Sequence, residues 1–228
     1  MTKEKILVVE DEEDILALVT YNLTREGYMV TGVTSGEAGL ESVSEVMPQL
    51  IVLDLMLPGV DGLTVCRTLK ENLTTKDIPI VMMTAKGEET DIITGLELGA
   101  DDYITKPFSP KVMIARIRAV LRRHATNLIT ADDSVTRDEI TINPGRHEVL
   151  INNIQIRLTS NEFRLLHYLA MRPGWVFTRD QIIAAVHTDD FAVTDRSVDV
   201  LIVGLRRKMG EAGCYIETVR GVGYRFIE

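Results

Sequence analysis

Residues 50–54 read LIVLD, an apolar run of strand length that ends on a carboxylate. The residues after it, LMLPGVDG at 55–62, contain proline and glycine, which favour a turn. Three more short apolar runs in the first half of the chain end on a chemically distinctive side chain. They are KILVV at 5–9 before Glu10 and Asp11, IPIVMM at 78–83 before Thr84, and YIT at 103–105 before Lys106. We interpret the four runs as strands of one sheet.

Amphipathic stretches of helical periodicity alternate with these runs. They occupy residues 13–26, 36–46, 62–72, 88–98 and 109–123, and one further strand is expected at 28–33. Five strand–helix units in succession predict an α/β fold, with a doubly wound five-stranded parallel sheet covered by helices on both faces.

The carboxyl ends of parallel strands lie at one edge of a sheet, where open α/β folds bind their ligands. We therefore expect Glu10, Asp11 and Asp54 to share a pocket with the hydroxyl of Thr84 and the ammonium of Lys106. This combination suits transfer of a phosphoryl group to Asp54 with the help of a divalent cation. Taken singly, each residue also has an ordinary structural interpretation, such as a solvated helix start or a surface lysine.

A carboxylate can attack a phosphoryl donor only if the crowded negative charge around it is neutralised. A Mg²⁺ or Mn²⁺ ion held by Glu10 and Asp11 would neutralise it, and the backbone carbonyl of Met56 is a further candidate ligand. Lys106 would add a fixed positive charge. The following Pro107 suggests a cis peptide bond that aims this lysine inward.

Composition places the protein among ordinary globular chains. Its 228 residues suffice for two domains, and 45% apolar with 26% charged residues is too balanced for disorder. We expect a cytoplasmic protein, because we find neither an apolar run of membrane-spanning length nor a secretory signal. The two cysteines lack a metal-ligand spacing. The net charge of −9 argues against non-specific binding of nucleic acid, although a local basic face can still bind DNA.

The periodicity changes in the second half of the chain. Residues 124–137 are expected to form a linker, and short strands are expected at 138–143, 147–151 and 154–157. Two capping boxes, Thr159 with Glu162 and Thr178 with Gln181, predict the starts of two helices. A terminal hairpin, with strands at 214–219 and 224–227, is expected around RGVG at 220–223.

A third helix is expected from about Asp195 to Met209. Its apolar stripe comprises Val198, Leu201, Ile202, Leu205 and Met209, and its opposite face carries Arg196, Val203 and Arg207. Three helices followed by a hairpin predict an α+β winged helix-turn-helix domain, whose third helix would enter the DNA major groove. An amphipathic helix that only packs on a small sheet is the alternative.

Several motifs resemble a known family over nearly the whole chain outside the linker. ILVVEDEEDI, LIVLDLMLPGVDG, IPIVMMTAKGE and GADDYITKPFSP resemble the receiver domain of two-component response regulators. TSNEFRLLHYLAMRPGWVFTRDQI, DRSVDVLIVGLRRKMG and IETVRGVGYRF resemble the winged-helix effector of the OmpR/PhoB subfamily. The resemblance implies a receiver at 1–123 with strand order 2-1-3-4-5, a linker at 124–137 and a DNA-binding domain at 138–228.

The family resemblance also implies roles for single residues. Asp54 would accept the phosphoryl group, Glu10 and Asp11 would bind the metal, and Thr84 and Lys106 would contact the phosphoryl oxygens. Tyr103 would swing inward when Thr84 moves. A cognate histidine kinase, promoter DNA, RNA polymerase and a second copy of the chain are the implied partners, with no membrane and no turnover enzyme activity.

Two surfaces are expected to bind partners, one a second copy of the chain and the other DNA. The dimer face formed on phosphorylation is assigned to Ile92, Glu97, Asp102, Val112, Arg116 and Arg123, with Ile92 and Val112 standing where the family usually places ion pairs. The DNA-binding surface is assigned to Arg196, Val203, Arg206, Arg207, Lys208, Arg220 and Arg225. Leu201, Val203 and Gly204 stand where more polar residues are common in the subfamily, and Val203 is a candidate for contact with a thymine methyl group.

Two other functions remain open at this point. A metal-dependent phosphatase or phosphotransferase with an aspartyl nucleophile would require a second acid two residues after Asp54, where this chain has Met56. A receiver-bearing interaction module that has lost DNA binding is compatible with the weakness of the basic face in the second half, which is slightly acidic as a whole.

Overall fold

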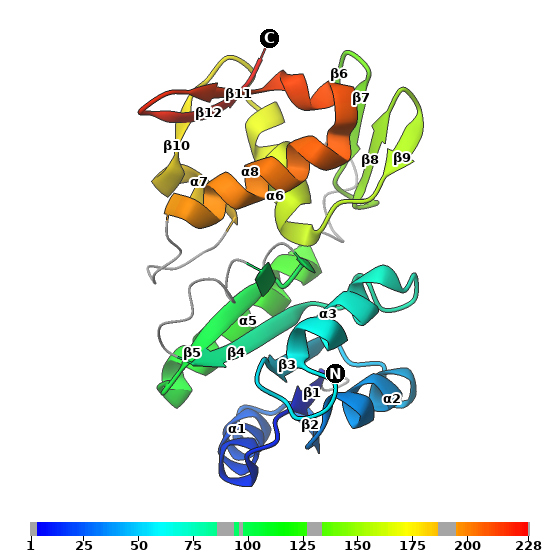
Figure 1. Cartoon of the computed structure of the whole chain (residues 1–228), viewed down its shortest axis with the longest axis vertical. Coiled ribbons are helices and arrows are strands. Elements are labelled where there is room, and N and C mark those ends of the chain that lie inside the picture. Colours follow the sequence, from blue (N-terminus) through cyan, green and yellow to red (C-terminus); the bar gives the residue numbers. More distant parts are fainter. Residues whose placement is uncertain (1–3, 86–93, 96–97, 127–133, 187–194, 228) are drawn as a thin grey trace. The chain divides into compact units, whose positions relative to one another are not determined.

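The computed structural model describes residues 4–85, 94–95, 98–126, 134–186 and 195–227 (Figure 1). The chain divides into two compact units, Met1–Arg123 and His124–Glu228, and each unit is described by itself.

The N-terminal unit contains a five-stranded sheet in the order β2-β1-β3-β4-β5, and all neighbouring strands are parallel. This order and the doubly wound architecture confirm the prediction from the sequence. The strands are β1 (Lys5–Val9), β2 (Met29–Val33), β3 (Leu50–Asp54), β4 (Ile80–Ala85) and β5 (Asp102–Lys106).

Helices cover both faces of this sheet (Figure 1). The helices are α1 (Glu13–Arg25), α2 (Gly36–Val46), α3 (Gly62–Glu71) and α5 (Pro110–Thr126). On one face, α1 and α5 pack with alternate strand residues such as Ile6 and Val8 in a single apolar core. On the other, Gly39 of α2 approaches Val9. The helix expected at 88–98 falls largely outside the described residues.

Sequence-encoded caps fix two helix ends in the N-terminal unit. Ser35 accepts a hydrogen bond from Ala38 N at 3.2 Å and so caps α2, as expected from its position before Gly36. Gly27 follows α1 with a φ of 99°, a left-handed conformation that glycine adopts without strain.

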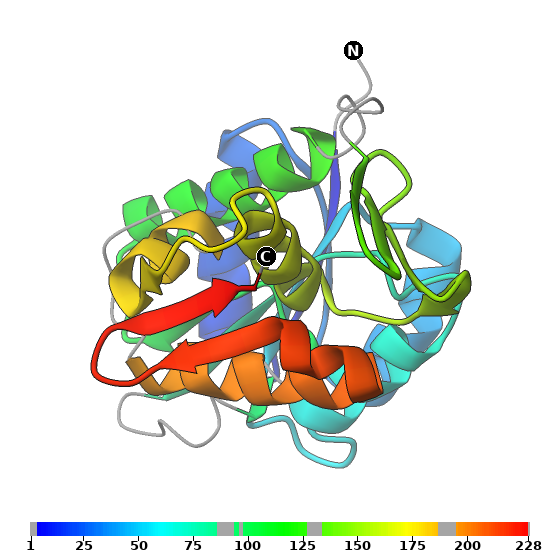
Figure 2. The ribbon, with the colours of Figure 1, turned by 90° about the horizontal axis from the view of Figure 1, so that it is seen from above.

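The C-terminal unit contains two antiparallel sheets with helices between them. The first has four strands, β6 (Val135–Arg137), β7 (Ile140–Asn143), β8 (Glu148–Ile151) and β9 (Ile154–Ile156), in sequence order. The second has the order β10-β12-β11, from β10 (Phe177–Thr178), β11 (Ile216–Val219) and β12 (Gly223–Phe226). The hairpin β11–β12 runs alongside α8 (Asp195–Met209) (Figure 2). Arg206 of α8 donates hydrogen bonds to β11. This arrangement confirms a winged helix-turn-helix.

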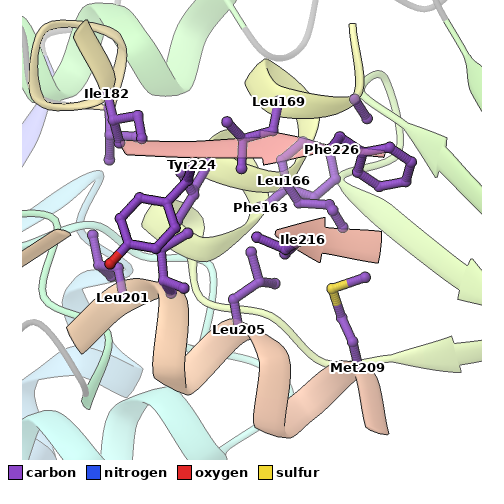
Figure 3. Packing of buried hydrophobic residues seen from close by; sticks show 14 of the residues in the cluster. Phe163, Leu166, Leu169, Ile182, Leu201, Leu205, Met209, Ile216, Tyr224 and Phe226 are labelled. Atoms are coloured by element: carbon purple, nitrogen blue, oxygen red, sulfur yellow. The ribbon is translucent and has the colours of Figure 1, made fainter. Parts of the chain in front are cut away.

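The apolar core of this unit lies between its helices and sheets (Figure 3). Helices α6 (Ser160–Ala170) and α7 (Arg179–Val186) begin where the capping boxes predict them, and the reciprocal hydrogen bonds of both boxes are present. The predicted stripe of α8 is buried throughout, from Val198 to Met209. Leu205 and Met209 point from α8 toward Ile216 of β11 (Figure 3).

Three predictions about this region need correction. Regular structure enters the expected linker at 124–137 from both sides, because α5 continues to Thr126 and β6 begins at Val135. The strand expected at 138–143 is shorter, β7 at Ile140–Asn143, because a tight turn with Asp138 at a φ of 47° joins it to the preceding strand β6, which was not predicted. The last hairpin begins at Ile216, because Gly210–Tyr215 form a 3-10 helix, η1, directly after α8.

The orientation of α8 can be tested with two neighbouring alanine variants. Ile202 is 1% exposed and Val203 is 61% exposed. We expect Ile202→Ala to lower the free energy of unfolding by about 2–5 kcal/mol, because it leaves a cavity in the core. Val203→Ala should change it by less than about 0.5 kcal/mol. Urea unfolding followed by the fluorescence of Trp175 measures both, and equal destabilisation would contradict this orientation of α8.

Candidate functional site: a carboxylate cluster and a basic helix–wing surface

The carboxyl edge of the parallel sheet brings Glu10, Asp54 and Lys106 into contact. Lys106 Nζ lies 2.9 Å from Glu10 Oε1 and 2.9 Å from Asp54 Oδ2, so one ammonium bridges both acids. Glu10 and Asp54 are almost fully buried, with 0% and 2% of their surface exposed. A third acid, Glu12, approaches the same ammonium at 3.6 Å but is itself mostly exposed.

Asp11 completes a set of three acids. One carboxylate oxygen from each of Glu10, Asp11 and Asp54 lies within 4.8 Å of the others. The buried Oε2 atom of Glu10 accepts no hydrogen bond from any described residue, although it lies 2.9 Å from Lys106 Nζ. A clustered set of hard oxygen donors with spare acceptor capacity fits Mg²⁺ or Mn²⁺.

The loop after β3 packs closely on Asp54. Met56 N donates a hydrogen bond to Asp54 Oδ1 at 3.3 Å. A Cβ atom at Gly62 would lie 2.1 Å from the carbonyl oxygen of Asp54, so only glycine lets α3 begin this close to the end of β3. The Lys106–Pro107 peptide bond is cis, as the sequence suggested.

Thr84 and Tyr103 lie on β4 and β5 beside this cluster. Strand register pairs Asp54 with Met83, the residue before Thr84, and pairs Ala85 with Lys106. Thr84 is completely buried, and its hydroxyl donates weakly to the carbonyl of Ala85 at 3.4 Å. Tyr103 is 5% exposed, so its ring lies inward in this structure.

Burial and charge perturb the ionisation of the cluster. Burial raises the pKa of Glu10 to about 7, the nearby charge of Asp54 adds to this rise, and the hydrogen bond from Lys106 opposes it. Burial alone would lower the pKa of Lys106, but its hydrogen bonds to Glu10 and Asp54 outweigh burial and raise it. Lys106 therefore stays cationic while Glu10 is poised to titrate near neutrality.

The raised pKa of Glu10 makes a testable contribution to stability. Because the folded state holds the proton more tightly than the unfolded state, whose pKa is near 4.5, this contribution declines as pH rises from about 4.5 to about 7. We expect Glu10→Gln to remove that decline in metal-free protein. Urea unfolding across this pH range measures it.

The matched control is Glu12→Gln, the same chemical change at an acid with 63% of its side chain exposed. It should leave the pH dependence of the parent unchanged. Curves for the parent and Glu10→Gln that run parallel from pH 4.5 to 7 would rule out the proposed titration of Glu10.

The residues assigned to a dimer face are only partly within the described structure. Ile92 and Glu97 lie outside the described residues. Asp102 and Arg116 form an ion pair with each other at 2.8 Å, and the Arg116 guanidinium also lies 5.8 Å from the ring centre of Tyr103. Val112 is 38% exposed on α5, and Arg123 donates to the carbonyl of Ala119 at 3.2 Å. The structure therefore pairs Asp102 and Arg116 within one chain.

Two cations assigned to DNA binding have partners inside the C-terminal unit. Arg206 donates through Nε and Nη2 to the carbonyl of Ile216, and also to Thr218 at 2.9 Å. Lys208 forms an ion pair with Glu162 at 2.6 Å. These contacts hold α8 against neighbouring elements, which the sequence pattern alone did not indicate.

The remaining four cations assigned to this surface differ in their surroundings. Arg207 on α8 and Arg220 at the wing tip are exposed, and neither pairs with another residue in the part of the chain that the structure describes. Arg225 pairs with Glu217 across the wing at 2.6 Å. Arg196 lies in the first turn of α8, but its side chain is not among those that the structure describes.

Sequence reasoning missed a cluster around Tyr224 of β12. Asp199 Oδ1 accepts hydrogen bonds from Tyr224 at 2.6 Å and from Arg179 at 2.8 Å. The guanidinium groups of Arg179 and Arg206 both lie within 6 Å of the Tyr224 ring centre, at 5.2 and 5.9 Å. Burial alone would raise the pKa of Asp199, but these hydrogen bonds lower it. Residues from three elements meet here, so no local sequence signal marks the cluster.

A 2-1-3-4-5 parallel sheet with clustered acids and a lysine at its carboxyl edge, joined to a winged helix-turn-helix, defines a two-domain regulatory architecture. Comparison with protein families agrees with it. Residues 6–118 match the response regulator receiver domain, and residues 153–226 match the C-terminal domain of transcriptional regulatory proteins.

Individual relatives match over the whole length. The chain is 44% identical to the alkaline phosphatase synthesis transcriptional regulatory protein PhoP of Bacillus subtilis, covering 99% of this chain and 97% of PhoP. It is 40% identical to the phosphate regulon transcriptional regulatory protein PhoB of Escherichia coli, covering 97% of each.

Solved structures agree with this relationship. A RitR mutant matches with a TM-score of 0.77 at 28% identity, covering 99% of both chains. DrrB, an OmpR/PhoB homologue from Thermotoga maritima, matches with a TM-score of 0.52 at 30% identity over both full chains. The chain belongs to the OmpR/PhoB family of two-component response regulators, which are DNA-binding transcriptional regulators and not turnover enzymes. None of the described helices is long and apolar enough to span a membrane.

Proposed function

We propose that Asp54 accepts a phosphoryl group from the phosphohistidine of a cognate kinase, and that this event controls DNA binding by the C-terminal unit. The bond between phosphorus and the kinase histidine breaks as a bond to an Asp54 oxygen forms. The observation that carries the proposal is the position of Asp54, buried at the end of β3 and 2.9 Å from the Lys106 ammonium. The receiver function is assigned to residues 1–123 and the DNA-binding function to 138–228.

Three acids and one backbone carbonyl are proposed to hold the metal. They are Glu10, Asp11 and Asp54, with the carbonyl of Met56 as a further ligand, and the oxygen spacing of the acids supports this set. A bound Mg²⁺ or Mn²⁺ ion would neutralise negative charge between the acceptor and the incoming phosphoryl oxygens.

Lys106 and Thr84 are proposed to contact the phosphoryl oxygens. The new charge on Asp54 gives the Lys106 ammonium a stronger partner than the carboxylates it bridges in this structure. Thr84 donates its hydroxyl to only a 3.4 Å contact here, so redirecting this donor toward a phosphoryl oxygen costs little. Movement of Thr84 would then favour one position of Tyr103.

Phosphorylation is proposed to shift the population toward a homodimer. Its interface would use the surface of α5 and β5, where Val112 offers an apolar contact and Arg116 can exchange its own Asp102 for that of the partner copy. Ile92, Glu97 and Arg123 complete the proposed set.

DNA binding is assigned to α8 and the wing, with RNA polymerase as the downstream partner. Arg207 and Arg220 are the exposed cations that support this surface, and Val203, one turn before Arg207 on α8, is exposed as well. Arg206 and Lys208 would act mainly by holding α8 in place, and Arg196 and Arg225 complete the proposed set.

The phosphoacceptor can be tested with a small phosphodonor and magnesium. We expect Asp54→Asn to abolish phosphorylation, because the amide cannot serve as the nucleophile. Retardation on a phosphate-affinity gel, checked by intact mass, measures the modification. Asp61→Asn is the matched control, since Asp61 is an exposed acid that caps α3. Labelling of Asp54→Asn at the level of the parent would overturn the acceptor assignment.

The DNA surface can be tested with Arg207→Ala and Arg220→Ala. If Arg207 reads a base, its loss should weaken the preferred site by about 1–3 kcal/mol and relax the selected sequence. Loss of a phosphate contact at Arg220 should weaken all duplexes alike and reduce the salt slope by about one. Anisotropy titrations at several salt concentrations measure both effects. Parental affinity in both variants would favour an interaction module that has lost DNA binding.

A further inference from the structure

The centre of the exposed face of α8 is apolar. Val203 is 61% exposed, while its neighbours Ile202 and Leu205 are buried in the core of the unit. One exposed valine is ordinary on a helix surface. Val203 is informative because most of the polar side chains around it already bind partners within the unit.

The cations beside Val203 are occupied within the unit. Arg206 makes three hydrogen bonds to Ile216 and Thr218, and Lys208 lies 2.6 Å from the buried carboxylate of Glu162. Either side chain would have to leave a partner, and Lys208 would leave a buried charge unpaired, in order to reach a base edge.

Two further positions on α8 also offer little for base recognition. Asp199 Oδ1 is occupied by Arg179 and Tyr224. Gly204 has no side chain, and an added Cβ would lie 3.0 Å from Glu162 Oε1, so the glycine makes room for the acid that holds Lys208. Among residues 197–209 of α8, the exposed ones are therefore Val203 and Arg207.

The base edges in the major groove offer one apolar group, the C5 methyl of thymine; the other groups are hydrogen-bond donors and acceptors. Resting on the DNA binding proposed above, we propose that α8 reads a thymine methyl group through Val203, and that Arg207, one turn further along, supplies the polar contact to the same half-site. The preferred DNA would therefore carry a thymine at the centre of each half-site. An arginine at the position of Val203 would instead contact a base there through hydrogen bonds.

The proposal predicts the effect of removing one methyl group from the DNA. Deoxyuridine pairs as thymidine does but lacks the C5 methyl. Burial of one methyl group corresponds to an affinity change of about fourfold. Each thymidine of the selected duplex is replaced in turn, and the full-length protein, phosphorylated with a small phosphodonor and magnesium, is titrated by fluorescence anisotropy.

We expect one or two central positions at which deoxyuridine weakens binding by the parent about fourfold. Val203→Ala should bind the unmodified duplex about fourfold more weakly and show no further loss at one of those positions. Ile154→Ala is the control, since Ile154 is a 70% exposed aliphatic residue of β9, outside the surface assigned to DNA binding. This control should keep the full sensitivity to deoxyuridine.

The outcomes separate the two proposals. Specific binding without any sensitivity to deoxyuridine, or with the full sensitivity retained in Val203→Ala, would overturn methyl recognition by Val203 and leave DNA binding standing. If the phosphorylated parent selects no duplex, the proposed DNA binding fails, and the methyl recognition that rests on it fails as well.

Discussion

The ammonium of Lys106 compensates two buried carboxylates, and the arrangement of the sheet edge depends on this compensation. Glu10 and Asp54 lose nearly all their hydration, which is costly for charged groups unless an opposite charge lies close. Lys106 lies 2.9 Å from each acid and comes from β5, whereas the acids follow β1 and end β3. The cluster therefore exists only when three strands are correctly aligned. Any added negative charge at Asp54 must change what Lys106 contacts.

In the C-terminal unit, too, cationic side chains bind acceptors of the same chain, but there they hold a helix in place. Its ion pairs and hydrogen bonds hold α8 against α6 and the wing, through Lys208 with Glu162 and Arg206 with Ile216. Charges used in this way are less available to DNA. The helix face left for recognition is consequently apolar at Val203 and cationic at Arg207.

Much of the fold could be predicted because its signals are local. The apolar runs ending at Glu10 and Asp54, and the capping boxes at Thr159 and Thr178, each lie within a few residues of sequence. The meeting of Glu10, Asp54 and Lys106 also followed, because parallel strands end at one edge. The partners of Arg206 and Lys208 could not be predicted, since a basic residue on a helix has the same pattern whether it faces DNA or a carboxylate 46 residues away. The short strand β10 and the helix η1 depend on tertiary packing.

The most direct test concerns Lys106 as the link between charge at Asp54 and dimer formation. Sedimentation of Lys106→Ala is compared with the parent and with Lys76→Ala, a partly exposed lysine before β4 that lies on neither α5 nor β5. We predict that Lys106→Ala is still phosphorylated with magnesium present but stays monomeric, while the parent and Lys76→Ala dimerise. Normal dimerisation of phosphorylated Lys106→Ala would contradict the central role of this lysine.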